Sequence, residues 1–106
     1  MEELTSKRCV EGAPRLSAEA LAQIAARLGR GWTVEGDRLR KEFRFPDFAQ
    51  ALAFVNRAGE VAEQENHHPD LHLSWGRVLV ETWTHSAGGL TENDFVLAAK
   101  IEEAAG

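Results

Sequence analysis

Two segments of the chain, 32–45 and 71–84, each carry the pattern of a β-hairpin, and a helical pattern follows each of them. Apolar and polar residues alternate along both segments, as they do in strands with one buried face. Gly36-Asp37 is typical of a two-residue turn that begins with glycine, and the second turn is predicted at Gly76-Arg77. Because a tight turn joins antiparallel neighbours, the two hairpins restrict the chain to an antiparallel sheet packed against helices.

Three further segments show the 3.6-residue apolar period of a helix that buries one face. The first begins at Ser17, a residue type that favours the N-cap. The second opens at 46–47 and must end by His68, because a residue before proline avoids helical backbone angles. The third begins at Thr91, with Asp94 three residues later as the acidic partner of a capping box.

The elements therefore follow the order α-β-β-α-β-β-α, which predicts an α+β fold: a four-stranded antiparallel sheet with three helices on one face. A length of 106 residues leaves no room for a second core, so 1–106 is predicted as a single domain. Within it, 1–15 shows no periodicity and contains Gly12 and Pro14, which predicts a loosely ordered arm. Lys41 interrupts the apolar face of its strand, which favours an edge or an end of the sheet.

Composition and charge argue against several classes of function. The net charge is −5 and no Lys/Arg block is present, whereas a nucleic-acid-binding protein needs a basic face. No apolar run approaches the roughly twenty residues that span a membrane, and 1–10 lacks the apolar stretch of a secretory signal. The single cysteine, Cys9, cannot form an internal disulfide, which suits a reducing compartment. We therefore expect a cytoplasmic protein without nucleic-acid or membrane partners.

Histidines gather where the predicted elements end. His67 and His68 close the second helix, and His85 ends the last strand. Hairpin geometry places these two ends at the same rim of the sheet, with Asp94 close in sequence to that rim. Glu63 lies one helical turn before His67, so its carboxylate is predicted to hold that imidazole in one tautomer.

Two chemical interpretations of the histidines remain open at this point. In the first, His67, His68, His72 and His85 supply nitrogen ligands to zinc. Against it, two adjacent histidines rarely face one ion, and His72 falls on the strand face opposite its leucine neighbours. In the second, which we favour, the imidazoles exchange protons near neutral pH without a metal. No Ser-His-Asp or Cys-His arrangement and no phosphate-binding glycine loop accompanies them.

The two histidine segments resemble the signature of the pterin-4a-carbinolamine dehydratases. Residues 63–70 (EQENHHPD) and 84–94 (THSAGGLTEND) carry the similarity, at the separation found in that family. Weaker similarities extend it from about residue 15 to the C-terminal helix. The family's fold, a four-stranded antiparallel sheet with three helices on one face, agrees with the fold expected from the patterns.

The resemblance implies a hydro-lyase that removes water from 4a-hydroxytetrahydropterin and yields quinonoid dihydropterin, as part of tetrahydropterin recycling. The implied catalytic residues are His67, His68 and His85. The implied substrate-binding residues are Glu63, Pro69, Thr84 and Asp94. No metal or organic cofactor is implied, because the pterin is itself the substrate.

Some expectations from the resemblance concern partners rather than chemistry. It implies a homodimer or homotetramer, which would cover the open edges of the sheet. It also leaves an alternative, a non-enzymatic dimerisation or assembly partner that uses helix surfaces rather than the histidines. Asn66 and Asn93 depart from the residues that animal members often carry, which affects the expected rate more than the expected reaction.

Overall fold

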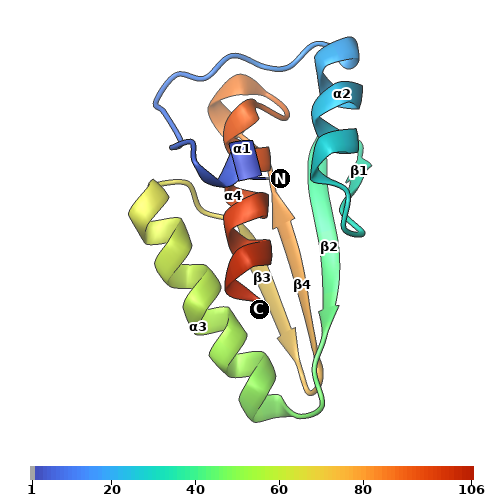
Figure 1. The fold of residues 1–106 in the computed structure, drawn as a ribbon, viewed down its shortest axis with the longest axis vertical. Helices are drawn as coiled ribbons and strands as arrows, with labels where there is room; N and C mark the ends of the chain where they lie inside the picture. The colour runs from blue at the N-terminus through green and yellow to red at the C-terminus, as the bar shows by residue number, and fades with distance from the viewer. Residues whose placement is uncertain (1) are drawn as a thin grey trace.

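The computed structural model describes residues 2–106, and Figure 1 shows its elements in chain order. The helices are α1 (Glu2–Thr5), α2 (Ala18–Leu28), α3 (Phe48–Glu65) and α4 (Glu92–Ala104), with a 3-10 helix, η1 (His85–Ala87). The strands are β1 (Thr33–Glu35), β2 (Arg38–Arg44), β3 (Asp70–Ser74) and β4 (Arg77–Thr82). The predicted order α-β-β-α-β-β-α is confirmed from α2 onward.

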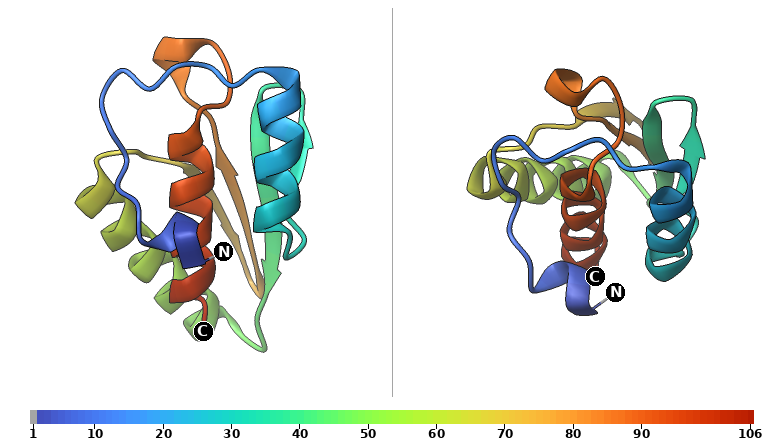
Figure 2. Two further views of the ribbon diagram at one scale, coloured as in Figure 1. Left: turned by 45° about the horizontal axis from the view of Figure 1, so that its top comes forward. Right: turned by 90° about the horizontal axis from the view of Figure 1, so that it is seen from above.

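The four strands form one antiparallel sheet in the order β1-β2-β4-β3, and α2, α3 and α4 cover one of its faces (Figure 2). The α+β prediction is therefore confirmed. Pairing with β1 ends at Arg40, so one side of β2 has no neighbouring strand at Lys41, which agrees with the edge position expected for this residue. The ammonium group of Lys41 lies on the helix-covered face of the sheet, 2.7 Å from Oε1 of Glu102 on α4. A long lysine side chain can thus occupy an inward position when a carboxylate meets it there.

The predicted helix starts are present with their capping contacts. Oγ of Ser17 accepts a hydrogen bond from the N–H of Ala20 at 3.1 Å. Helix α3 is capped by Asp47, whose Oδ1 accepts from the N–H of Gln50 at 2.8 Å. These contacts satisfy amide groups that have no partner within the helix, which explains why the helices begin where the sequence predicts.

Helix α4 is buried on more than one side, unlike an amphipathic helix that buries a single face. Every residue from Asn93 to Ala99 is buried, because the sheet lies on one side of α4 and α1 packs on another. Leu4 of α1, only 1% exposed, takes part in this packing. The arm predicted as loosely ordered thus begins with a helix that joins the core, and the first turn of α4 lies beneath the segment that follows it.

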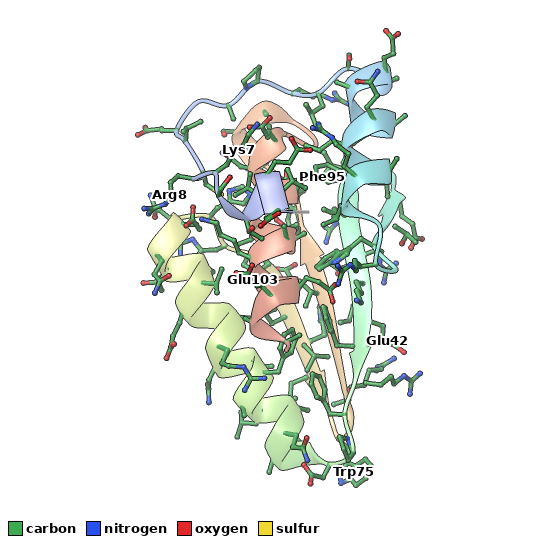
Figure 3. The ribbon with its side chains drawn as sticks, viewed as in Figure 1. Lys7, Arg8, Glu42, Trp75, Phe95 and Glu103 are labelled. Carbon is green, nitrogen blue, oxygen red and sulfur yellow. The ribbon has the colours of Figure 1, made fainter. Side chains whose placement is uncertain are left out.

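The second hairpin turns one residue earlier than predicted. Trp75 and Gly76 form the turn, and Ser74 pairs with Arg77. Trp75 is consequently 69% exposed at the end of the molecule where α3 begins (Figure 3). A Cβ on Gly76 would lie 2.8 Å from the carbonyl oxygen of Phe45, and the N–H of Phe45 donates to Gly76 at 2.9 Å. This close backbone contact fixes glycine in the turn.

Within residues 2–106, the helices all fall short of the length and apolar character that a bilayer crossing demands.

Candidate active site

His67 lies immediately beyond the C-terminal end of α3, and the way that helix ends directs its ring. Asn66 adopts a left-handed backbone conformation with φ of 52°. The N–H of His67 then donates to the carbonyl of Ala62 at 3.2 Å, which gives the two-bond ending known as a Schellman motif. The chain therefore turns away from the helix axis, and His67 faces the start of α4.

The partner of His67 at the start of α4 is Asp94. Nε2 of His67 lies 2.7 Å from Oδ1 of Asp94. The Asp94 side chain is completely buried, whereas the imidazole keeps 13% of its surface exposed. The ring is thus anchored at one nitrogen and accessible along part of its surface.

Three other groups donate hydrogen bonds to the Asp94 carboxylate. Oγ1 of Thr82 donates to Oδ1 at 2.7 Å, and Oγ1 of Thr84 donates to Oδ2 at 2.8 Å. The N–H of Thr91 donates to Oδ2 at 3.0 Å, which confirms the predicted capping box. With this set of donors the carboxylate acts as the acceptor, so the hydrogen lies on Nε2 of His67. In the neutral ring Nδ1 is then left as a proton acceptor.

The predicted pairing of Glu63 with His67 was wrong, because the carboxylate of Glu63 binds His68 instead. The prediction assumed that the helix continued to His67, which would have placed the ring four residues along the same face. The left-handed turn at Asn66 ends the helix first. Both partners of the Glu63–His68 contact are exposed, so solvent screens this pair.

His85 begins η1, in a tight loop that the main chain closes. The N–H of Thr84 donates to the carbonyl of Gly89 at 3.0 Å, and the N–H of Gly88 donates to His85 at 3.1 Å. The His85 side chain is exposed, and its ring has no hydrogen-bond partner within residues 2–106. Pro69, also predicted at the site, is half-buried between α3 and β3.

A cavity of about 210 Å³ opens beside His67. It is lined by the N-terminal segment, the end of α3, the loop after β4 and the first turn of α4. The lining residues are Cys9, Val10, Glu11, Gly12, Ala13, Glu65, Asn66, His67, Thr84, Ser86 and Asn93. Of the predicted site residues, His67 and Thr84 line it, Asp94 lies behind His67, and His85 lies between the lining residues Thr84 and Ser86. Glu63, His68 and Pro69 are outside the lining.

The N-terminal segment was absent from the predicted site, and the buried carboxylate of Glu65 holds part of it there. Glu65 accepts from the N–H of Cys9 at 2.8 Å and from Nζ of Lys100 at 2.8 Å. Burial alone would raise the pKa of Glu65, but the hydrogen bonds from Lys100 and Cys9 and the charges of Lys100 and Arg8 outweigh it and hold the pKa below its usual value. Burial, followed by the negative charge of Glu65, raises the pKa of Cys9 to about 12. The Cys9 thiol is therefore protonated at neutral pH.

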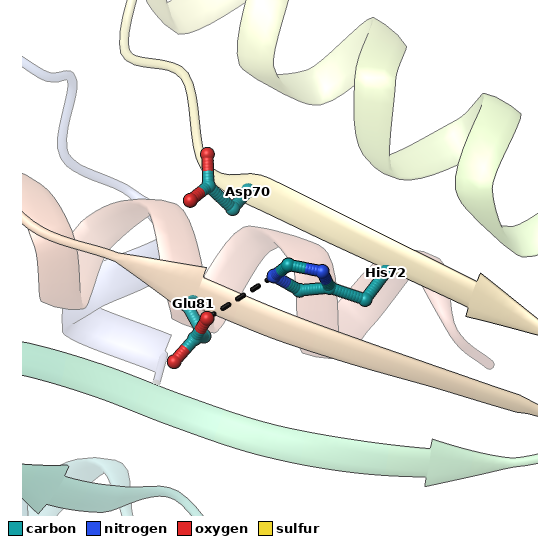
Figure 4. Close-up of side chains that lie close together, drawn as sticks. All are labelled: Asp70, His72 and Glu81. Atoms are coloured by element: carbon teal, nitrogen blue, oxygen red, sulfur yellow. Dashed lines mark hydrogen bonds and ion pairs between the residues drawn. The ribbon is translucent and has the colours of Figure 1, made fainter.

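His72 lies away from the other histidines, on the sheet face that the helices leave open. Its Nε2 lies 3.1 Å from Oε1 of Glu81 on the neighbouring strand, with Asp70 close by (Figure 4). The three groups are close enough to share a cation, but Arg38 and Arg40 already contact the carboxylates at 3.4 to 3.8 Å. The four histidines considered as zinc ligands therefore do not converge on one point.

Comparison with known proteins places these features in a family. A family model described as pterin 4 alpha carbinolamine dehydratase matches residues 14–104. A Rubrobacter xylanophilus protein, provisionally named as a pterin-4-alpha-carbinolamine dehydratase, is 49% identical over 106 residues, which cover 96% of this chain and 98% of that protein. The crystal structure of a transcriptional coactivator/pterin dehydratase from Brucella melitensis is similar with a TM-score of 0.80 and 33% identity, over 87% of this chain and 99% of that one.

A further solved structure shares the fold at lower similarity. It is a pterin dehydratase-like protein identified as a RuBisCO assembly factor in the alpha-carboxysome, with a TM-score of 0.59. Its sequence is 24% identical, over 71% of this chain and 87% of that one, so the likeness concerns the fold alone.

Proposed function

The chain belongs to the pterin-4a-carbinolamine dehydratase family, and from this membership we propose that it removes water from 4a-hydroxytetrahydropterin to yield quinonoid dihydropterin. The observation that carries the proposal is the His67–Asp94 pair on the wall of the cavity. A buried carboxylate that holds one nitrogen of an imidazole raises the basicity of the other, as general base catalysis requires.

We assign the removal of the substrate's N5 proton to His67. Its Nε2 is engaged by Asp94, so Nδ1 is the nitrogen that remains to accept a proton. The geometry supports this role because the carboxylate fixes the ring through a buried contact and the cavity lies beside it. Loss of this proton supplies the electron pair that forms the new double bond as the 4a-hydroxyl leaves.

Departure of the 4a-hydroxyl requires a second group, which protonates the leaving oxygen so that it departs as water. We assign this role to His85, with His68 assisting. The neighbours of His85 on both sides, Thr84 and Ser86, line the cavity, and the exposed His85 ring can regain its proton from solvent. The two proton transfers together remove one water molecule and require no added cofactor.

The remaining predicted residues have supporting roles in this proposal. Asp94 and Thr84 fix His67 and the cavity wall. Glu63 orients His68, and Pro69 fixes the backbone after the two histidines. We also propose a cytoplasmic homodimer or homotetramer, in which a partner covers an edge strand, β1 or β3. Light scattering at micromolar concentration tests this, and the mass of a monomer would contradict it.

Dehydration of freshly generated 4a-hydroxytetrahydropterin tests the function. Wild-type protein is compared with His67→Ala and His85→Ala, and His72→Ala serves as the matched control on the opposite sheet face. We expect each site variant to lose about 100-fold or more in rate, within the range that one general acid or base contributes, and the control to keep its rate. No acceleration by folded wild-type protein would refute the dehydratase and favour a non-enzymatic binding role.

A further inference from the structure

Two neighbouring residues in the first turn of α4 each hold a different wall of the cavity. Asp94 holds His67. Asn93 holds the N-terminal segment that we call the strap, defined as residues 8–13. The chemistry of His67 requires a ligand held beside it, so the residues that place the opposing lining bear on catalysis as well.

The Asn93 side chain binds the strap through both of its polar atoms. Its Oδ1 accepts from the N–H of Val10 at 2.9 Å, and its Nδ2 donates to the carbonyl of Val10 at 2.7 Å. The carbonyl of Asn93 also accepts from the Cys9 thiol at 3.4 Å. Asn93 is only 7% exposed, so these bonds form where water competes weakly. The amide thus pairs with one strap residue as a neighbouring strand would.

A second anchor fixes the start of the strap to α3 and α4. Glu65 binds the N–H of Cys9, and Nε of Arg8 lies 3.1 Å from its Oε2. Arg8 also donates to the carbonyl of Gln64 at 3.0 Å, and it lies beside the C-terminal end of α3 (Figure 3). Lys100 of α4 completes the contacts of the Glu65 carboxylate. The anchors hold residues 8–10, and the strap continues beyond them along the cavity.

Beyond Val10 the strap offers unused polar groups. Glu11 and Gly12 form a turn, and apart from that turn the backbone N–H and C=O groups of residues 11–13 make no hydrogen bond of normal geometry within residues 2–106, although all three residues line the cavity. Gly12 has a φ of +76°, a conformation that glycine adopts without strain and that turns the strap here. The pyrimidine ring of a pterin carries N–H, NH₂ and C=O groups along its edge, and backbone groups of this kind match them.

We propose that the strap is a ligand-contacting wall of the pterin site and that Asn93 is its positioning residue. This inference rests on the proposed function for the identity of the ligand. Asn93 does not touch the reacting atoms. It sets the position of residues 11–13 and thereby the affinity for the pterin, while Asp94 and His67 set the rate of the proton transfer.

The sole cysteine reports on the strap independently of catalysis. Cys9 is half-buried, and its pKa of about 12 makes it slow to react with 5,5′-dithiobis(2-nitrobenzoate) at pH 8, because the thiolate is the reactive form. We expect Asn93→Ala to raise the labelling rate about tenfold or more, as the strap detaches. We expect 7,8-dihydrobiopterin to slow labelling of the wild type and to have a much weaker effect on Asn93→Ala.

Steady-state kinetics separate a positioning role from a general loss of structure. In Asn93→Ala the KM is expected to rise about tenfold while kcat changes less than about threefold, because the loss concerns binding. Glu102→Gln is the matched control, since it breaks a partly buried ion pair of α4 with Lys41 away from the strap. It should leave both the KM and the labelling rate near their wild-type values.

A second variant keeps the test decisive if Asn93→Ala does not fold. Gly12→Val places a β-branched side chain at positive φ, where it strains the turn, yet its Cβ would meet no atom within 4 Å. It should raise the KM without loss of the fold. The proposal would be overturned by a variant in which Cys9 is labelled faster while the KM is unchanged and the pterin still slows labelling as it does in the wild type. Pterin protection of Cys9 in a wild type without turnover would support the strap while the dehydratase itself failed.

Discussion

His67–Asp94 and His72–Glu81 are the same chemical pair in two different settings. In the first, Nε2 of His67 lies 2.7 Å from a carboxylate that is completely buried. In the second, Nε2 of His72 lies 3.1 Å from Glu81, and the imidazole is 54% exposed on the open face of the sheet. Both contacts join a histidine to an acid from another element, so the presence of the pair does not by itself identify a catalytic site.

The groups that share the carboxylate separate the two pairs. Asp94 accepts from the hydroxyls of Thr82 and Thr84 and from one backbone N–H, all of them neutral donors. Glu81 is shared with the guanidinium groups of Arg38 and Arg40. Neutral donors orient a carboxylate without cancelling its charge, which then acts on the imidazole, whereas two guanidinium groups cancel it. The remaining partners of the acid therefore decide what the histidine can do.

Replacement of the acid tests this comparison with the largest expected effect. In Asp94→Asn, an amide NH₂ replaces one acceptor atom among donors in a buried site, and the tautomer of His67 is no longer fixed. We expect kcat/KM to fall about 100-fold and the free energy of unfolding to fall by about 2 to 3 kcal/mol. Glu81→Gln, the matched change in the other pair, should keep kcat/KM within about twofold. Equal losses in the two variants would contradict the comparison.

The sequence predicts those parts of the fold that local chemistry determines. The first hairpin turn and the helix starts at Ser17 and Thr91 depend on residues a few positions apart, and the structure has them where the patterns indicated. The second turn was displaced by one residue because the decisive contact, Gly76 against the carbonyl of Phe45, joins distant parts of the chain. The alternation of apolar and polar residues was equally consistent with Trp75 as the last residue of the strand.

The candidate site was predictable only in part for the same reason. Histidines at the ends of hairpin elements indicated the correct rim of the sheet, and the capping box located Asp94. The partner of His67 was missed because a single left-handed residue, Asn66, redirects the chain. The strap was missed entirely. It is held by contacts such as that between Val10 and Asn93, which are 83 positions apart, and such contacts leave no local pattern.

Glu65 provides an intermediate case that separates burial from counter-charge. Like Asp94 it is buried, and like Glu81 it is paired with cations, here Lys100 and Arg8. We expect Glu65→Gln to cost about 2 kcal/mol of unfolding free energy at pH 6, because the hydrogen bonds lose their charge. Because Glu65 also anchors the strap, any loss of dehydration should appear in the KM and not in kcat, since Glu65 does not contact the His67 ring.

The pH dependence of this cost follows from the lowered pKa of Glu65. A carboxyl group with a lower pKa in the folded state stabilises the fold above its unfolded pKa, near 4.5, and this contribution is lost as pH falls through the folded pKa. Urea unfolding of wild type and Glu65→Gln at pH 6 and pH 3 measures it. The difference between the two proteins should shrink at pH 3, and a difference that stays constant would argue against an ionised Glu65 as the stabilising species.

Removing one threonine hydroxyl tests the role of the neutral hydrogen-bond donors to Asp94, and a smaller effect is expected. Thr82→Val removes one buried hydroxyl while keeping the shape of the side chain, so it should lower the unfolding free energy by about 1 kcal/mol. Thr33→Val on β1 is the control, because the Thr33 hydroxyl is exposed and its contact with the carbonyl of Arg40 is long, at 3.5 Å. The control should change stability by less than about 0.5 kcal/mol. A Thr82 variant as stable as wild type would mean that Asp94 does not depend on this donor.

The smallest effect is expected for the His72–Glu81 pair, on the open face of the sheet. His72→Asn should cost less than about 0.5 kcal/mol at low salt, and 1 M NaCl should abolish most of that cost, because exposed charges are screened. The loss of dehydration in His67→Ala should persist at both salt concentrations, since its acidic partner is completely buried. A large, salt-independent cost at His72 would mean that exposure does not weaken such a pair. The distinction between the two histidines would then have to rest on the cavity beside His67 alone.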